Sequence, residues 1–597
     1  MCGILGLYSM DGRDLPAELV LRGLDAMKER GTPHGSGVAL YRPVGVPRVK
    51  AFSERPAEDG LSIQIPGGLY DLTFFGSPVN VEGMVYLNSR WLDVYKAVGW
   101  PRDIDSMYDL RSLSSSAWLG HTRYPTNSPG RYPYYSHPFT AGDFAIVHNG
   151  DLSSYGSNVN LLTYRMGYRG FTGNDSEAIA FLLKELSERL GVEGAIRELM
   201  YGEEFRWARL DGPYAVAFLA GGPTPVFGAF VDPQHFRPLY VGISGDVIAV
   251  ASEAAAIRAI LGDAMYWALR GGEYLIAEGD DLHGNFRRRY SYPSYVPSPP
   301  ARAVDASRFS AVDLAPHLRG ILEGGVGGGE GNAGMGPGPE VDVVNVQGHR
   351  YIGNGMDRGV LRIWGVVGNA SANVMSGGTI HVYGDVQDDF GDAMNGGAAF
   401  IHGNAGDTLG QAKRGGSIYV YGDAGNRAGI QQRGGAIVIG GSVGDYAGEY
   451  MGGGIMVVLR ATGEDDVGFR IGSGMVGGRI YVRGRIPRER IGRIMRRDAL
   501  ERYLRSLLED GALDEAAYER AVAGDLSQLS RAARRVLVGV NPLSVEYRRL
   551  GEGELREVVP HLREFEGAFG VSVDASEEFT VIAPAAGRES EEPSVGE

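Results

Sequence analysis

The chain has 597 residues and a formal net charge of −15. This length exceeds a single hydrophobic core, so we expect two or three domains. Clustered lysine and arginine bind phosphate backbones, and because this acidic chain has no dense basic block, we expect no nucleic-acid partner. No apolar run is long enough to span a membrane and no secretory signal opens the chain, so we predict a cytoplasmic protein without membrane attachment.

The first region, residues 1–290, mixes helical and strand patterns. Apolar residues at helical spacing predict amphipathic helices, and alternating apolar runs predict strands, the last of which folds back at a Ser-Gly-Asp turn. The helices are expected at 14–30 and 176–190, and the strands at 144–150, 214–221 and 238–252. Helices combined with antiparallel hairpins indicate a layered α+β domain.

Residues 291–340 are predicted to form a flexible linker. The stretch SYPSYVPSPPARA is rich in proline, and GGVGGGEGNAGMGPGP at 324–339 is mostly glycine. Such compositions favour extended or flexible chain over packed structure. A phosphate-binding loop is the competing interpretation of the glycines, but no Lys-Ser/Thr pair follows them.

Residues 341–486 repeat with a period of nineteen. Two alternating apolar positions follow each glycine pair, one column running from Leu361 to Ile480 and the other from Ile363 to Val482. The pairs lie at 377–378, 396–397, 415–416, 434–435, 453–454 and, after an insertion, 477–478. Strand alternation that recurs at a longer fixed period predicts a β-helix of about seven coils with glycine at the corners. A dinucleotide fingerprint explains the glycines less well, since no βαβ unit surrounds them.

The last region, residues 487–597, is predicted to be a helical segment followed by a disordered tail. Apolar residues fall at helical intervals from Ile491 to Leu507. The terminal stretch ESEEPSVGE is polar and acidic, as disordered chain ends commonly are.

The only cysteine, Cys2, directly follows the initiator methionine. The small Gly3 favours removal of that methionine, after which one residue carries both a thiol and the chain's α-amine. An α-amine has a pKa of about 8, so it can accept the thiol proton and later return it to a leaving amine. A chance buried cysteine is the alternative. A single cysteine excludes an internal disulfide and an iron–sulfur cluster ligated by this chain.

Six short segments of the first region occur in a characteristic order. They are MCGILGL, GHTRYPTN (120–127), VHNGDL (147–152), GNDSEAIA (173–180), LDGPYAVAF (210–218) and the pair RPLYVG and ASE (237–242, 251–253). Together they resemble the class II glutamine amidotransferase domain. The resemblance implies an N-terminal-nucleophile hydrolase with an αββα sandwich over residues 1–290, which acts on L-glutamine.

The resemblance implies roles for five residues. Cys2 is the expected nucleophile, which attacks the side-chain amide of glutamine and releases ammonia. Asn149 and Gly150 match the family's two oxyanion donors, a side-chain amide and a backbone N–H. Arg123 matches the arginine that binds the α-carboxylate of glutamine, and Asp175 matches the aspartate that accepts from its α-ammonium. For the arginine and the aspartate, a surface ion pair is the alternative.

Other parts of these motifs are expected to be structural or depart from the family. His121 and His148 are assigned structural roles, because the α-amine already provides a base. Many family members carry an Asp-Ser pair near residue 30, but the segment ERGTPHGSG at 29–37 lacks it and keeps only Arg30 and Gly31. The synthetic domains of asparagine synthetases and sugar-phosphate aminating enzymes are absent as well.

The glycine-rich repeat resembles the GXGXG domain, a right-handed β-helix at the C-terminal end of glutamate synthases. In those enzymes an FMN-binding barrel with an iron–sulfur cluster lies between the two domains and reduces 2-iminoglutarate to glutamate. Here a linker replaces the barrel. The resemblance therefore implies fused subunits of a split glutamate synthase-like enzyme, a type that includes N-methylglutamate synthase. We expect no cofactor on this chain, and FMN and the iron–sulfur cluster on a partner subunit of an oligomeric complex.

Two other functions remain open. In the first, the chain is a free-standing amidohydrolase that releases ammonia or acts on another amide, and its β-helix only aids assembly. In the second it is a scaffold, as GXGXG helices also occur in a subunit of formylmethanofuran dehydrogenase that has no glutaminase. The presence of all five expected site residues argues against the scaffold.

Overall fold

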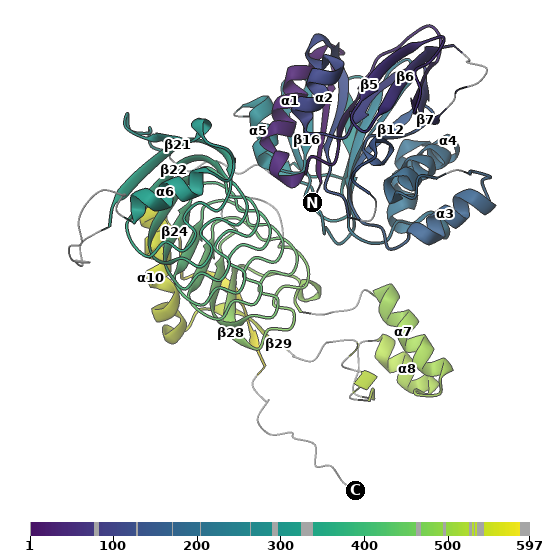
Figure 1. Cartoon of the computed structure of the whole chain (residues 1–597). Coiled ribbons are helices and arrows are strands. Elements are labelled where there is room, and N and C mark those ends of the chain that lie inside the picture. Colours follow the sequence, from purple (N-terminus) through teal and green to yellow (C-terminus); the bar gives the residue numbers. More distant parts are fainter. Residues whose placement is uncertain are drawn as a thin grey trace. The chain divides into compact units, whose positions relative to one another are not determined.

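The computed structural model describes residues 2–585 apart from 77–80, 82, 127–128, 170, 203, 263, 289–295, 324–337, 461–466, 493–496, 524–527, 531, 534–535 and 537–542. The chain divides into two compact units, Met1–Tyr290 and Ser291–Glu597 (Figure 1). Within the described ranges, no helix has both the length and the apolar character needed to cross a membrane.

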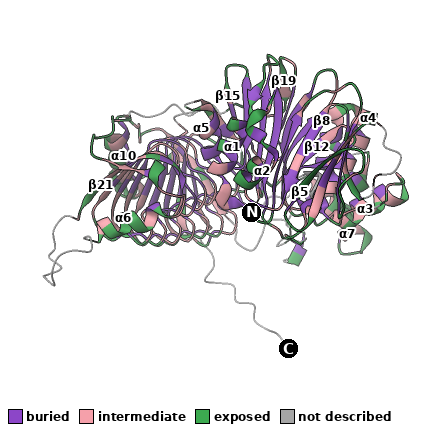
Figure 2. Ribbon diagram, turned by 45° about the horizontal axis from the view of Figure 1, so that its top comes forward, coloured by how far each residue is buried: buried purple, intermediate pink, exposed green. Residues whose placement is uncertain are grey.

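Two antiparallel β-sheets form the centre of the first unit, and their ribbons are largely purple, the colour of buried residues, in Figure 2. Ile4 from one sheet and Val147 from the other belong to the same fully buried cluster between them. On the outer faces, Leu24 of α1 packs on the first sheet and Leu183 of α4 packs on the second. The predicted αββα sandwich is confirmed.

The sheet that carries the N-terminal strand has seven strands. Their order is β17 (Met265–Ala268), β15 (Tyr240–Ser244), β16 (Val247–Ala251), β1 (Gly3–Ser9), β10 (Ala117–Thr122), β3 (Ser36–Tyr41) and β8 (Leu92–Ala97). Its outer face is covered by α1 (Ala17–Ala26), α2 (Pro101–Tyr108) and α5 (Ala254–Leu261).

The second sheet has six strands. Their order is β11 (Phe139–Ala141), β12 (Phe144–Gly150), β13 (Tyr214–Ala220), β14 (Val226–Val231), β18 (Tyr274–Glu278) and β19 (Asp281–Gly284). Its outer face is covered by α3 (Tyr155–Tyr164) and α4 (Asp175–Tyr201). Gly191, with φ 73°, interrupts α4 just where the amphipathic pattern of the sequence stops.

A four-stranded sheet that the sequence patterns did not indicate lies between β3 and β8 in the chain. Its order is β5 (Leu61–Ile65), β6 (Leu69–Phe75), β4 (Arg48–Ser53) and β7 (Met84–Ser89). Lys50 on β4 is buried and forms ion pairs with Asp71 at 3.6 Å and Asp93 at 3.8 Å. Buried charges of this kind break the apolar alternation by which strands are usually recognised.

The second unit is built on a parallel β-helix. Strands β21 to β28 pair in parallel from one coil to the next, so that Leu361 lies beside Ile380 and Ile418 beside Ile437. Every residue of the two predicted apolar columns is fully buried. The second glycine of each pair has a positive φ, for example 68° at Gly416, a conformation that a side chain disfavours. The β-helix prediction is confirmed.

Before the seven predicted coils, the parallel ladder contains a further long strand. The additional strand, β21, places Val341 and Val343 in the core, but no glycine pair precedes it, so the repeat did not include it. The strands are β21 (Glu340–His349), β22 (Val360–Val367), β23 (Ser376–Tyr383), β24 (Gly396–Ile401), β25 (Ser417–Val420), β26 (Ala436–Ile439), β27 (Gly452–Val458) and β28 (Gly477–Arg483).

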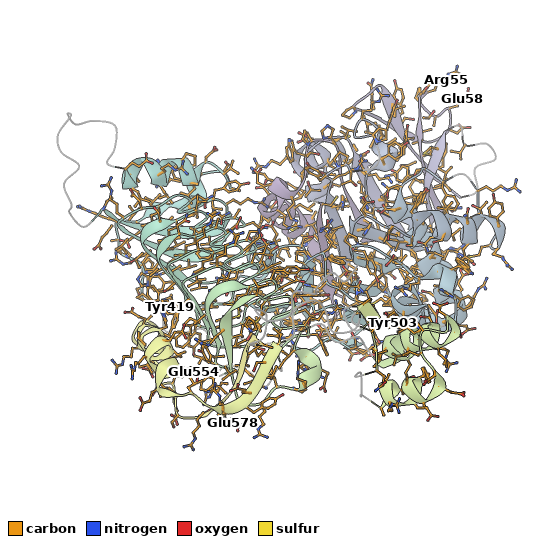
Figure 3. All side chains as sticks on the ribbon, turned by 90° about the horizontal axis from the view of Figure 1, so that it is seen from below. Arg55, Glu58, Tyr419, Tyr503, Glu554 and Glu578 are labelled. Carbon is orange, nitrogen blue, oxygen red and sulfur yellow. The ribbon has the colours of Figure 1, made fainter. Side chains whose placement is uncertain are left out.

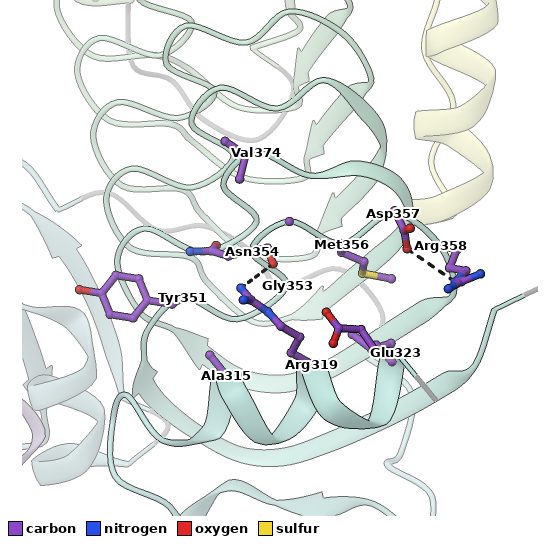
Figure 4. A pocket seen from close by; sticks show the side chains of 12 residues that line it. Ala315, Arg319, Glu323, Tyr351, Gly353, Asn354, Met356, Asp357, Arg358 and Val374 are labelled. Carbon is purple, nitrogen blue, oxygen red and sulfur yellow. Dashed lines mark hydrogen bonds and ion pairs between the residues drawn. The ribbon is translucent and has the colours of Figure 1, made fainter. Parts of the chain in front are cut away.

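The prediction of a structureless linker over 291–340 is wrong for its middle part. Strand β20 (Val304–Asp305) pairs in parallel with β21, and α6 (Leu314–Leu322) buries Leu314 and Leu318 in the core of the β-helix. Arg319 of α6 donates to the carbonyl oxygen of Asn354 at 3.1 Å, beside a pocket at the first coil (Figure 4). The surrounding proline and glycine obscured this short helix. The glycine-rich stretch 324–337 lies outside the described residues.

The C-terminal region is not only helical, which corrects the prediction for 487–597. Strand β30 (Glu578–Pro584) pairs antiparallel with β28 and with β29 (Leu543–Arg549), so two antiparallel strands end the parallel ladder. The helix α10 (Glu552–Phe569) lies between β29 and β30 in the chain and covers one face of the coils. Its His561 lies 3.0 Å from the hydroxyl of Tyr419, which is labelled in Figure 3. The predicted disordered tail, ESEEPSVGE, lies outside the described residues.

Two further helices of the C-terminal region, α7 (Arg497–Glu509) and α8 (Glu515–Val522), pack against each other. Both helices belong to the second compact unit, which also contains the coils of the β-helix.

Candidate active site

Cys2 lies immediately before β1, the middle strand of the seven-stranded sheet. Its Sγ donates to the carbonyl oxygen of Tyr124 at 3.6 Å and accepts from the Tyr124 N–H at 3.3 Å. Its own carbonyl oxygen accepts from Nε of Arg30 at 3.0 Å. Arg30 is itself held by an ion pair with Glu253 at 3.2 Å, in which both side chains are 2% exposed. Main-chain and side-chain contacts therefore fix the thiol at the end of the sheet.

Cys2 opens onto a small pocket that the ends of several elements share. Arg123 follows β10, Gly150 ends β12, and Asp175 begins α4, and all three line this pocket with Cys2. Four of the five residues that the sequence indicated are therefore together, although they come from separate parts of the chain.

The fifth residue, Asn149, is buried next to Gly150 on β12. Along this strand, Ala145 and Val147 pack between the two sheets, and the alternation of a strand places Asn149 on the same face. Its Nδ2 is buried and has no hydrogen-bond partner among the described residues. An unpaired buried amide is costly, so this group is suited to meet charge that a ligand brings.

Gly150 cannot be replaced without a steric conflict. A Cβ atom at this position would lie 2.0 Å from the carbonyl oxygen of Pro213 on the neighbouring chain segment. Glycine thus lets the backbone end of β12 approach the pocket closely, as an oxyanion donor requires.

Arg123 is buried and held by main-chain oxygens. Its Nη1 donates to the carbonyl oxygens of His34 at 3.3 Å and Pro129 at 3.2 Å. Its backbone N–H donates to Gly35 O at 2.9 Å, and its carbonyl accepts from Thr32 N at 2.8 Å. The segment that departs from the family pattern therefore holds this arginine, which is buried and not on the surface.

Asp175 is the first residue of α4, and Asn174 caps that helix by accepting from the Ser176 N–H at 2.9 Å. One carboxylate oxygen of Asp175 accepts from the Leu152 N–H at 2.9 Å. The side chain is 4% exposed. A carboxylate fixed in this way leaves its remaining lone pairs for a cationic group in the pocket.

Burial raises the pKa of the Cys2 thiol, while the Tyr124 N–H and the nearby guanidinium of Arg123 oppose that rise. The neutral thiol is thus favoured at physiological pH, and attack on an amide requires a base. Among the described residues, the hydrogen bonds of this thiol go to the main chain of Tyr124, and none joins it to a histidine ring.

Three buried histidines form a cluster, and two of them, His137 and His148, line the pocket. Nε2 of His137 and Nδ1 of His148 each lie 2.9 Å from Oγ of Ser176, and the ring of His121 stacks on that of His137. Burial lowers the pKa of all three, that of His121 to about 3. They are therefore neutral at physiological pH.

His137 and Ser176 were not singled out by the sequence. Ser176 lies inside the GNDSEAIA segment, so its position in a motif was a usable signal. His137 comes from a loop that no motif covered.

Comparisons find known proteins that are similar to this chain. The model of the GXGXG motif family matches residues 342–493. An uncharacterized protein of Archaeoglobus fulgidus is 30% identical over 356 residues, which cover 46% of this chain and 91% of that protein. The glutamine amidotransferase-like protein GlxB of Rhizobium meliloti is 28% identical over 286 residues, which cover 43% of this chain and 91% of that protein.

A glutamine–fructose-6-phosphate aminotransferase of Aeropyrum pernix is 29% identical over 277 residues, 46% of this chain and 35% of that enzyme. The chain belongs to the class II glutamine amidotransferases, and a GXGXG domain is fused to it. In this amidotransferase the candidate nucleophile, the candidate oxyanion-donor segment and the two candidate glutamine ligands all belong to the first unit.

Proposed function

We propose that this chain hydrolyses L-glutamine through a thioester on Cys2 and passes the ammonia to a separate FMN-dependent subunit of a glutamate synthase-like complex. The observation that carries the proposal is the single pocket in which Cys2 meets Arg123, Gly150 and Asp175. The partner would make glutamate or N-methylglutamate.

The reaction begins when removal of Met1 gives Cys2 a free α-amine. That amine takes the thiol proton, and the sulfur attacks the carboxamide carbon of glutamine. The resulting oxyanion accepts from Nδ2 of Asn149 and the N–H of Gly150. The tetrahedral intermediate collapses as the α-ammonium returns a proton to the leaving amine, which releases ammonia. Water then attacks the thioester, and its hydrolysis yields glutamate and the free thiol.

Recognition of glutamine uses charges at the opposite end of the substrate. The buried guanidinium of Arg123 suits the α-carboxylate, since paired N–H donors match a carboxylate well. The fixed carboxylate of Asp175 suits the α-ammonium. Both ligands are rigid before the substrate binds, so little conformational freedom is lost on binding.

The proposed partner rests on two features. The GXGXG match is shared with glutamate synthases, whose amidotransferase delivers ammonia to an FMN-bearing domain. This chain also has a single cysteine, and it cannot ligate an iron–sulfur cluster by itself. FMN and the cluster therefore belong to the proposed partner.

The test is the rate of glutamine hydrolysis with and without the FMN subunit and 2-oxoglutarate. The isolated chain should show no flavin absorbance and weak glutaminase activity, and the partner should raise that activity roughly five-fold or more, as coupling between sites commonly does. Full activity alone, with no complex at physiological concentration, would instead establish a free-standing amidohydrolase. If the chain hydrolysed no glutamine with or without the partner, the scaffold function would remain.

A further inference from the structure

His148 presents to the active-site pocket a nitrogen that the proposed mechanism does not use. Its Nδ1 lies 2.9 Å from Oγ of Ser176. Its Nε2 is buried and has no hydrogen-bond partner within the part of the chain that the structure describes. The residue is 2% exposed and lines the pocket. A buried polar atom without a partner is costly unless a ligand or water engages it.

The backbone places this nitrogen beside the expected position of the substrate. His148 and Gly150 are two residues apart on β12, so they face the same side of the strand. A Cβ atom on Gly150 would lie 2.6 Å from Nε2 of His148. On that side the pocket is completed by Asp175. Nε2 therefore lies next to the expected oxyanion segment, in the same pocket as the carboxylate assigned to the α-ammonium.

The hydroxyl of Ser176 restricts how the neighbouring rings carry their protons. It lies 2.9 Å from His148 and 2.9 Å from Nε2 of His137, and it has one proton to donate. Burial keeps both rings neutral, so each carries a single N–H. The Ser176 hydroxyl also lies 3.4 Å from Oδ1 of Asp175, to which it can donate. If the Ser176 proton goes to Asp175 or to His137, then Nδ1 of His148 donates to Ser176 and Nε2 of His148 is an acceptor.

We propose that Nε2 of His148 accepts a hydrogen bond from the α-ammonium of bound glutamine, beside Asp175, and that Ser176 is a positioning residue that selects this tautomer. The inference rests on the proposed glutaminase function. An ammonium group offers three donors, and Asp175 already uses one of its oxygens for Leu152, so a second acceptor fits. A neutral ring next to a carboxylate accepts from a cation without adding repulsion.

The first test compares two substrates, L-glutamine and glutaramate, which lacks the α-ammonium. His148→Asn keeps an amide near the Nδ1 position but removes the nitrogen that faces the pocket. The ratio of kcat/KM for glutamine over glutaramate should fall about tenfold or more, mainly through KM for glutamine. His148→Gln, whose amide reaches the Nε2 position, should recover part of that ratio. The matched control is His121→Asn, a buried histidine that does not line the pocket, which should keep the wild-type ratio.

The second test addresses Ser176 and the tautomer. Ser176→Ala should lower the same ratio, and Ser176→Thr, which retains a hydroxyl, should restore it. Nitrogen chemical shifts of the labelled wild-type protein should place the His148 proton on Nδ1, a measurement that needs no variant to fold. A proton on Nε2, or an unchanged ratio in folded His148→Asn, overturns the inference while glutaminase activity stands. A wild-type protein that does not hydrolyse glutamine overturns the proposed function and this inference with it.

Discussion

The thiol of Cys2 and the amide of Asn149 are polar groups removed from water whose reaction partner enters with the substrate. Burial raises the pKa of the thiol, and Nδ2 of Asn149 has no partner among the described residues. A buried amide that stays unpaired, as that of Asn149 does, costs about 1–3 kcal/mol of stability. A rigid hydrogen-bond donor without a partner can stabilise a transition state well, because it requires no reorganisation when charge develops.

Removal of the nucleophile should abolish both chemistry and labelling. Because Cys2 is the only thiol, an electrophilic glutamine analogue should modify one site in the wild-type protein and none in Cys2→Ala, which should also lose glutamine hydrolysis. Mass spectrometry of the mature protein should show that Met1 is missing. A fully active enzyme that retains Met1 would contradict the mechanism, since its Cys2 would lack a free α-amine.

Loss of the side-chain oxyanion donor should affect turnover more than binding. Asn149→Ala should lower kcat by roughly a hundredfold or more with little change in KM, because the donor acts on charge that exists only in the transition state. Steady-state kinetics measure this directly.

Asn158 provides a matched control. It is also a buried asparagine, but its Nδ2 donates to the carbonyl oxygens of Trp207 at 3.0 Å and Arg209 at 3.2 Å. Asn158→Ala should therefore lower the melting temperature and leave the turnover of the folded fraction near wild type. If Asn149→Ala behaved in the same way, its oxyanion role would be wrong.

Within the β-helix, one interior column of side chains contains an unexpected charge. The column has methionine in five of its seven coils, and Lys413 and Gln432 take the other two places. The methionines are Met356, Met375, Met394, Met451 and Met475. Lys413 is fully buried, and its Nζ donates to the carbonyl oxygens of Gly416 and Gly434. Burial lowers its pKa to about 7.

Replacement of this lysine should stabilise the β-helix, most strongly at neutral and acidic pH. Because its pKa is about 7 when folded and ordinarily near 10.5, the unfolded chain binds more protons between these values. The stability of the wild type therefore rises with pH across that window, by up to about 1.4 kcal/mol per unit.

Lys413→Met should remove that slope, since methionine fills the same column in neighbouring coils. Both carbonyls keep other donors: Gly416 O accepts from the Ala436 N–H, and Gly434 O accepts from Nε2 of Gln432. Calorimetric melting at pH 7 and pH 9.5 measures the effect. The variant should gain most at pH 7, and an equal or larger gain at pH 9.5 would show that charge burial is not the cause.

The elements of this chain were predictable where the pattern was local and periodic. The two columns from Leu361 and Ile363 gave the β-helix, because its coils repeat the same contacts nineteen residues apart. The strands β29 and β30 were not predictable, since β30 pairs with the distant strand β28 and β29 pairs with β30, and such pairing is set by distant contacts. Helix α6 was hidden by the proline and glycine around it.

The candidate site was predictable from motifs and not from physical pattern alone. Arg123, Gly150 and Asp175 lie in three separate segments, and nothing in their spacing shows that they meet. The His137–Ser176–His148 contacts depend on how a loop packs against the start of α4. No periodicity encodes that packing, so the role of His148 required the structure.

At the scale of the whole molecule, the two units have separate cores. No buried apolar cluster in the described residues contains members from both sides of residue 290. Hydrophobic burial is the main source of stability, so each unit should hold its fold without the other.

Separate expression of residues 1–290 should therefore yield a folded protein that keeps basal glutamine hydrolysis. The stimulation expected from the FMN subunit should be lost or weakened, because the GXGXG domain is then absent. Glutaminase rates with the partner, for this fragment and for the full chain, give the comparison. If the partner stimulates the fragment as strongly as the full chain, the β-helix is not needed for the stimulation.

The antiparallel strands at the end of the β-helix have a consequence for solubility. A parallel ladder ends in a strand whose backbone donors and acceptors are available to any other exposed edge, which is the route to fibrous polymers. Here β30 bonds to β28 and β29 follows it, so the last coil is covered by strands of opposite direction that cannot continue the nineteen-residue repeat. The chain thus covers its own last coil, and the parallel edge of β28 is not available to the edge strand of another molecule.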